Sequence, residues 1–155
     1  TQKKVDVFPS YYMTDPVNLR AKGFSLNYVN PHEYGINIYG NVLFTTEKKL
    51  KKNPDVVRKF VKAYVQGWRW AVKNPKKTGQ VFAKLNDKVP AENQVKILKR
   101  TLPYVKRNGS MQGFGQMTTD KWRSTLNILQ QDPEVSKADI SKFDLSSAYN
   151  AAYLK

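Results

Sequence analysis

Apolar residues recur every three or four positions between Pro54 and Asn74. This spacing places them on one face of a helix of about five turns, residues 54–74, whose opposite face is basic. Shorter helices are predicted over residues 17–22, 47–52, 75–85, 90–102, 118–131 and 145–154, the first two from capping residues and prolines at their ends and the others mainly from apolar or small residues at helical spacing. Pro103 is expected to end the fourth of these, because proline lacks the backbone N–H that a helix needs.

Three other stretches alternate apolar and polar residues in the manner of strands: residues 3–8, 24–29 and 35–45. The third is expected to bend near Gly40, where the missing Cβ allows close backbone approach. Two or three strands do not make a stable sheet by themselves. The pattern therefore predicts an α/β chain, rich in helix and with few strands, whose sheet lacks some of its strands.

Composition limits the chemistry that this chain can perform. Among its 155 residues there is no cysteine and one histidine, His32, which we interpret as a surface residue in a loop. Thiolate nucleophiles, cysteine-ligated zinc and paired-histidine metal sites are therefore excluded for the chain alone. We expect no catalytic residue, no metal site and no cofactor. No run of about 18 apolar residues is present, so no segment is expected to span a membrane.

The charge of the chain is strongly one-sided, with 27 lysines and arginines against 12 acidic residues and a formal net charge of +15. A positive field of this size attracts polyanions, so nucleic-acid binding is an alternative function. The lysines are spread along several helices and do not form one arm or a known nucleic-acid motif. We therefore favour the simpler interpretation, in which they face solvent.

Three blocks of sequence resemble a known family. Residues 12–16 read YMTDP and form a turn between the strand at 5–7 and the helical LRAKG of 19–23. Residues 34–46 read YGINIYGNVLFTT, and residues 53–60 open the long helix. Together they resemble the periplasmic solute-binding proteins that serve uptake of thiamine-pyrimidine precursors, nitrate, sulfonates and taurine. The resemblance covers roughly residues 4–130, and the same domain occurs as the sensor region of signalling proteins.

The resemblance implies the C-terminal portion of a two-lobed α/β domain, the periplasmic-binding-protein type II fold. Residues 1–34 would be the end of the second lobe, and residues 35–155 the returning strand and helices of the first. The N-terminal half of the family domain would be absent. A pyrimidine-synthesising branch of the family uses a cysteine-rich motif, which this chain lacks.

The function implied is therefore non-enzymatic capture of a small molecule, a pyrimidine, a sulfonate or a similar solute, in the periplasm or another extracytoplasmic space. The captured molecule would be passed to ABC-type uptake or detected by a sensor. The expected partners are a membrane permease or the signalling part of the same parent chain.

The candidate ligand contacts are four residues on a strand-to-helix turn and two in the tyrosine–glycine block: Tyr11, Tyr12, Thr14 and Asp15, and Tyr39 and Asn41. Residues that face a ligand gather on such turns in α/β proteins, and aromatic rings with a few polar groups hold flat ligands. Asp15 occupies the place of a glutamate in the family's turn and is shorter by one methylene. The alternative roles are structural: Asp15 caps the helix, the tyrosines are half-buried, and Gly40 bends a strand.

Overall fold

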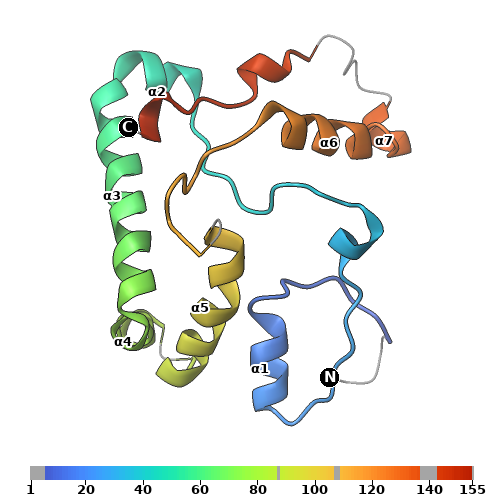
Figure 1. The fold of residues 1–155 in the computed structure, drawn as a ribbon, viewed down its shortest axis with the longest axis vertical. Helices are drawn as coiled ribbons and strands as arrows, with labels where there is room; N and C mark the ends of the chain where they lie inside the picture. The colour runs from blue at the N-terminus through green and yellow to red at the C-terminus, as the bar shows by residue number, and fades with distance from the viewer. Residues whose placement is uncertain (1–5, 87, 107–108, 137–142, 155) are drawn as a thin grey trace. The chain divides into compact units, whose positions relative to one another are not determined.

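The computed structural model describes residues 6–86, 88–106, 109–136 and 143–154. These residues form α-helices joined by loops and short 3-10 turns (Figure 1). The α-helices are α1 (Asp15–Ala21), α2 (Glu47–Lys52), α3 (Pro54–Lys73), α4 (Pro75–Leu85), α5 (Ala91–Val105), α6 (Thr119–Leu129) and α7 (Pro133–Ser136). The 3-10 turns are η1 (Pro31–Tyr34), η3 (Leu145–Ser147) and η4 (Ala152–Leu154).

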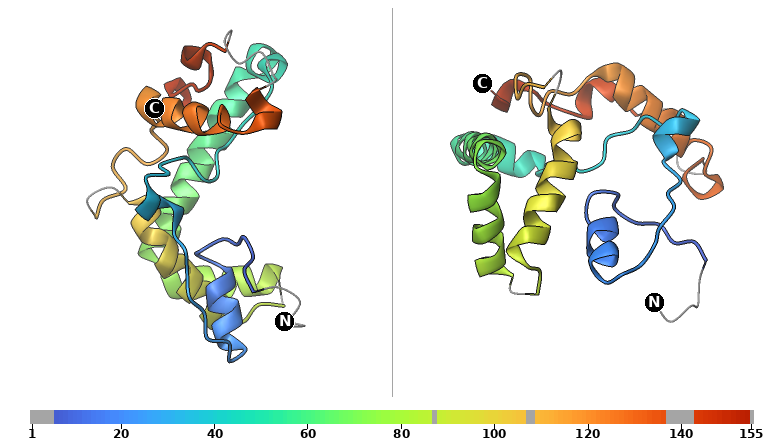
Figure 2. Two further views of the ribbon diagram at one scale, coloured as in Figure 1. Left: turned by 90° about the vertical axis from the view of Figure 1, so that its right-hand side faces the viewer. Right: turned by 60° about the horizontal axis from the view of Figure 1, so that its bottom comes forward.

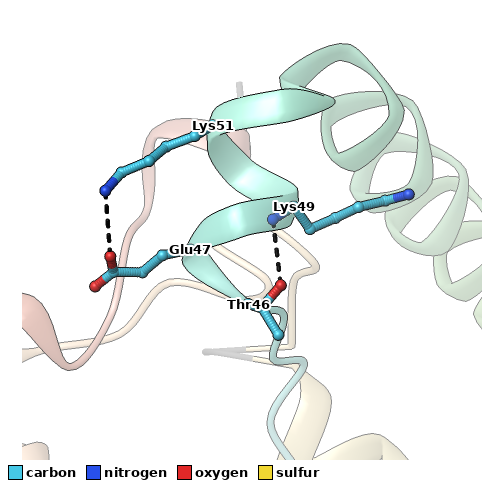
Figure 3. Close-up of polar contacts among 4 residues, drawn as sticks. All are labelled: Thr46, Glu47, Lys49 and Lys51. Atoms are coloured by element: carbon cyan, nitrogen blue, oxygen red, sulfur yellow. Dashed lines mark hydrogen bonds and ion pairs between the residues drawn. The ribbon is translucent and has the colours of Figure 1, made fainter.

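The predicted helices are confirmed most closely where prolines and capping threonines mark their ends. The helices expected at 47–52 and 75–85 have those bounds, and the long helix ends one residue earlier than expected. At the start of α2 the hydroxyl of Thr46 accepts a hydrogen bond from the amide of Lys49 at 3.2 Å (Figure 3). This bond satisfies one of the amides that a helix start leaves without a partner.

Two helix predictions need correction. α5 does not stop at Pro103 but continues to Val105, because hydrogen bonding resumes past the proline: the amide of Lys106 donates to the carbonyl of Leu102 at 2.9 Å. The helix expected over 145–154 is two 3-10 turns. Side chains compete there for the backbone, since the carboxylate of Asp144 and the amide oxygen of Asn150 each accept a backbone N–H two residues ahead.

The three predicted strands do not form within the described part of the chain, and neither Figure 1 nor Figure 2 draws one there. Residues 3–5 lie outside the described residues, and 6–8, 24–29 and 35–45 have no strand assignment. The third stretch does bend, at Asn41 beside the expected position. A strand exists only when its backbone pairs with a neighbouring strand, and no described segment offers that pairing.

The chain divides into two units, and the division falls inside α3 between Gln66 and Gly67. One unit combines Thr1–Tyr28 with Gly67–Phe114, and the other combines Val29–Gln66 with Gly115–Lys155. These units differ from the predicted lobes, 1–34 and 35–155. The division into lobes stays a prediction, because nothing in the structure of the described residues tests it.

In the first unit α4 packs along α5, and α1 packs against α5 from another side (Figure 2). The buried residues of this packing include Val17 of α1, Leu98 of α5, and Thr78 and Gly79 of α4. A Cβ added to Gly79 would lie 2.6 Å from the carbonyl oxygen of Ala91, so the absence of a side chain allows the two helices to approach closely. This packing sets the position of the candidate site.

Candidate ligand-binding site

Three tyrosine rings from separate parts of the first unit lie together. Tyr12 comes from the turn before α1, Tyr28 from the segment after it, and Tyr104 from the last turns of α5. The centre of the Tyr12 ring lies 5.2 Å from that of Tyr28 and 6.4 Å from that of Tyr104, both edge to face. All three side chains are partly exposed, so part of each ring surface is available to a ligand.

Two arginines complete this group. The guanidinium carbon of Arg100 lies 4.2 Å from the centre of the Tyr12 ring, and that of Arg20 lies 5.2 Å from the centre of Tyr28. Neither guanidinium forms an ion pair with an acidic residue in the described part of the chain. The tyrosine–arginine cluster, defined as Tyr12, Tyr28, Tyr104, Arg20 and Arg100, is therefore aromatic and positively charged.

The turn that carries Tyr12 is held by its neighbours. The carbonyl of Tyr11 accepts hydrogen bonds from the amides of Thr14 and Asp15, at 3.0 and 3.2 Å. The carboxylate of Asp15 accepts from the amide of Tyr11 at 3.2 Å, and the hydroxyl of Thr14 donates to the carbonyl of Tyr11 at 3.4 Å. Thr14 and Asp15 thus stabilise the turn, and Tyr11 and Tyr12 present exposed rings from it.

Tyr39 and Asn41 belong to the other unit and are not brought into the cluster. The hydroxyl oxygen of Tyr39 accepts a hydrogen bond from the amide of Thr118 at 2.8 Å, and its ring lies 5.5 Å from the ring of Trp122. The ammonium of Lys121 lies 4.8 Å from the centre of the same ring. Tyr39 therefore links the loop between η1 and α2 to the start of α6. Asn41 is exposed.

The other members of the cluster were not predicted from the sequence, namely Tyr28, Tyr104, Arg20 and Arg100. Arg100 and Tyr104 are four residues apart in α5, so they lie on one helix face, and this spacing was a usable signal. Their approach to Tyr12, 88 residues away from Arg100, depends on how α5 packs against α1 and has no local signal.

The cluster is suited to binding and offers no metal chemistry. No group of three or more histidine, cysteine, aspartate or glutamate side chains that could hold a metal occurs among the described residues. Ring faces and edges can stack on a flat ligand, and the guanidinium N–H groups can donate to its carbonyl oxygens or to an anionic group. Within the same described residues, no helix is long and apolar enough to cross a membrane.

Two characterised proteins are similar to the chain. It is 26% identical to the riboflavin-binding protein RibY of Chloroflexus aurantiacus, over 96% of this chain and 45% of that protein. It is 25% identical to the formylaminopyrimidine-binding protein of Halalkalibacterium halodurans, over 72% of this chain and 34% of that protein. The chain thus spans less than half the length of either relative. No solved structure matches it significantly.

The relatives confirm the predicted resemblance to solute-binding proteins, since both are named for the small molecule that they bind. The family model described as NMT1/THI5-like matches residues 1–78, which include the YMTDP turn and the YGINIYGNVLFTT block. This family has the type II periplasmic-binding fold, as predicted, although the few strands of that prediction do not form among the described residues. The chain therefore belongs to the NMT1/THI5-like family.

Proposed function

We propose that this chain is part of an extracytoplasmic solute-binding protein. It captures a small, flat molecule with hydrogen-bonding groups around its ring at the tyrosine–arginine cluster. The observation that carries the proposal is the arrangement around Tyr12, where two tyrosine rings and the guanidinium of Arg100 meet on an accessible surface. Aromatic rings provide stacking area at little entropic cost, and the guanidinium provides directed donors.

Heteroaromatic rings with carbonyl or amino substituents match this surface best. The two relatives are named for riboflavin and formylaminopyrimidine, and both molecules contain a flat nitrogen heterocycle with polar edges. Tyr11 and Tyr12 supply rings from the turn, and Thr14 and Asp15 keep the turn in shape. Tyr39 and Asn41 stay proposed ligand contacts.

The binding role extends to uptake or sensing. A captured solute would be delivered to a membrane permease of the ABC type, or its presence would be reported by the signalling part of a parent chain. No chemical conversion is part of the proposal. Capture and release need a surface that binds reversibly, and the cluster has donors and rings for that purpose.

Isothermal titration calorimetry with riboflavin and with formylaminopyrimidine tests the proposal, with taurine as a small aliphatic comparison. The heterocycles are expected to bind, and Tyr28→Ala is expected to weaken binding at least about tenfold through lost stacking and burial. Tyr34→Ala is the matched control, because Tyr34 lies outside the cluster and its side chain is 73% exposed. Equal loss of affinity in both variants, or no binding of either heterocycle, would contradict the proposal.

The same preparation tests nucleic-acid binding, the alternative that the net charge of +15 favours. Titration with duplex DNA at 50 and at 200 mM salt measures the number of phosphate contacts, because each contact adds to the salt dependence. Tight DNA binding that weakens steeply with salt, together with no response to the heterocycles, would favour the alternative.

A further inference from the structure

Two guanidinium groups of the tyrosine–arginine cluster lie near one ring. The guanidinium carbon of Arg20 lies 5.2 Å from the centre of the Tyr28 ring, and that of Arg100 lies 5.9 Å from the same centre. Both distances are shorter than the screening length of about 8 Å at physiological salt. A group bound at the Tyr28 ring therefore lies in the electric field of both cations.

The acidic groups of the same unit do not compensate these two charges. Its described acidic residues are Asp6, Asp15 and Glu92. The carboxylate of Glu92 pairs with the ammonium of Lys96 at 2.7 Å, and the carboxylate of Asp15 accepts a hydrogen bond from the amide of Tyr11. None of the ion pairs among the described residues includes either arginine. A neutral carbonyl group of a ligand would leave both charges uncompensated, whereas an anionic group would compensate them.

The donors of Arg20 are not used within the described part of the chain. Nε and Nη2 of Arg100 donate to the carbonyl oxygen of Tyr12, so part of that side chain already has a structural role. The guanidinium of Arg20 donates no hydrogen bond to another described residue, and Arg20 is exposed in the last turn of α1. A guanidinium presents its N–H groups as a planar fork that fits two oxygens of a carboxylate or a phosphate. Arg20 is therefore the residue of the cluster best able to bind an oxyanion.

We propose that the cluster prefers heterocycles that carry an anionic oxygen group, a carboxylate or a phosphate ester, over neutral heterocycles of the same shape. Arg20 binds the anionic group, Arg100 adds its charge, and the heterocycle stacks on the ring of Tyr28. This inference rests on the proposed function and narrows its class of ligand. Hydrogen bonds that involve a charged group are roughly twice as strong as neutral ones, so one anionic group is enough for a measurable preference.

Isothermal titration calorimetry with two matched pairs of ligands tests the inference. Riboflavin is compared with riboflavin 5′-phosphate, and uracil is compared with orotate, its carboxylated form. In at least one pair the anionic member is expected to bind at least about tenfold more tightly than the neutral member. The preference should shrink as the ionic strength rises from about 0.01 to 0.15 M, because the screening length falls from about 30 to 8 Å. The pair that shows the preference identifies the anionic group.

Arg20→Gln removes the positive charge and keeps a polar side chain. It is expected to reduce the ratio of the neutral ligand's dissociation constant to that of the anionic ligand at least about fivefold. Lys22→Gln is the matched control, because it removes the same charge two residues later, from an exposed ammonium that lies over no ring of the cluster. This control should leave the ratio unchanged.

The outcomes separate this inference from the proposed function. Equal affinity for the neutral and anionic members of both pairs would overturn the inference alone. An equal change of the ratio in Arg20→Gln and Lys22→Gln would also overturn it, because the preference would then be a general effect of charge. Competition by inorganic phosphate as strong as that by the anionic heterocycles would overturn it too, since the site would not recognise the ring. Binding of none of the heterocycles would overturn both.

Discussion

Arg100 holds both the ring and the backbone of Tyr12. Its guanidinium carbon lies 4.2 Å from the ring centre, and its Nε and Nη2 atoms donate to the carbonyl oxygen of Tyr12 at 3.2 and 3.1 Å. A flat, forked cation can make these contacts together, whereas an ammonium group cannot. One side chain of α5 thus links this helix to the turn before α1 and supports the tyrosine on which the proposed binding depends.

Replacement of Arg100 by methionine is expected to lower the free energy of unfolding by about 1 kcal/mol, through loss of two charged hydrogen bonds and one cation–ring contact at a partly exposed place. Arg100→Lys should retain part of this stability. Urea denaturation of the chain measures both. Lys99→Met is the matched control on the same helix, because Lys99 is exposed, and its effect should stay within about 0.5 kcal/mol. Equal destabilisation by the two methionine variants would show that the Tyr12 contacts are unimportant.

Helices were predictable from the sequence because their determinants are local. The bounds of α2 follow from Thr46 at one side and the Asn53-Pro54 pair at the other, and α4 begins at Pro75. The Pro103 error shows the limit of such rules. A proline in the last turns removes one hydrogen bond, and the remaining bonds and the packing of Leu98 keep α5 helical to Val105.

Strands and the site were less predictable because they depend on partners far away in the sequence. The alternation at 35–45 is real, but its pairing requires another strand, which the described residues do not provide. Four candidate ligand contacts on the turn, Tyr11, Tyr12, Thr14 and Asp15, were predicted from their position before a helix. Arg100, which contacts Tyr12, lies 88 residues away in the sequence, and no local sequence pattern predicts such a contact.

The cap of α2 gives a second prediction. Thr46→Ala removes the hydroxyl that accepts from the Lys49 amide (Figure 3) and should reduce the stability of this six-residue helix by about 1 kcal/mol. Faster amide exchange at Lys49 and Leu50 measures the loss. Thr46→Asp should restore slow exchange, since a carboxylate also caps and interacts well with a helix start. Thr45→Ala is the control, and a change there as large as in Thr46→Ala would argue against capping.

Two helical glycines should respond in opposite directions to alanine. Gly79→Ala places a Cβ 2.6 Å from both the Ala91 carbonyl oxygen and a Val95 methyl, so the α4–α5 packing must open. We expect a loss of about 1–3 kcal/mol, which exceeds the gain in helix propensity. Gly67→Ala in α3 meets no atom within 4 Å and should raise stability by about 0.5–1 kcal/mol. Thermal unfolding of both variants measures the effects, and a stabilised Gly79→Ala protein would refute the close packing.

The pKa of the Asp144 carboxyl tests the hydrogen bonds that hold the turn η3. The hydroxyl of Ser146 at 2.6 Å and then its amide at 2.8 Å lower the pKa of this carboxyl below its ordinary value. Because the pKa of Asp144 is lower in the folded chain than in the unfolded one, its ionised carboxylate stabilises the turn η3 at pH values above the ordinary pKa of about 3.9. This stabilisation is lost as the pH falls through the lower pKa of the folded chain. Carbon NMR titration should show the pKa rising in Ser146→Ala. The pKa should stay unchanged in Ser147→Ala, because the Ser147 hydroxyl donates to the backbone carbonyl of Asp144, at 2.7 Å, and not to its carboxylate. Equal pKa values of Asp144 in the unaltered chain and in both variants would disprove this assignment.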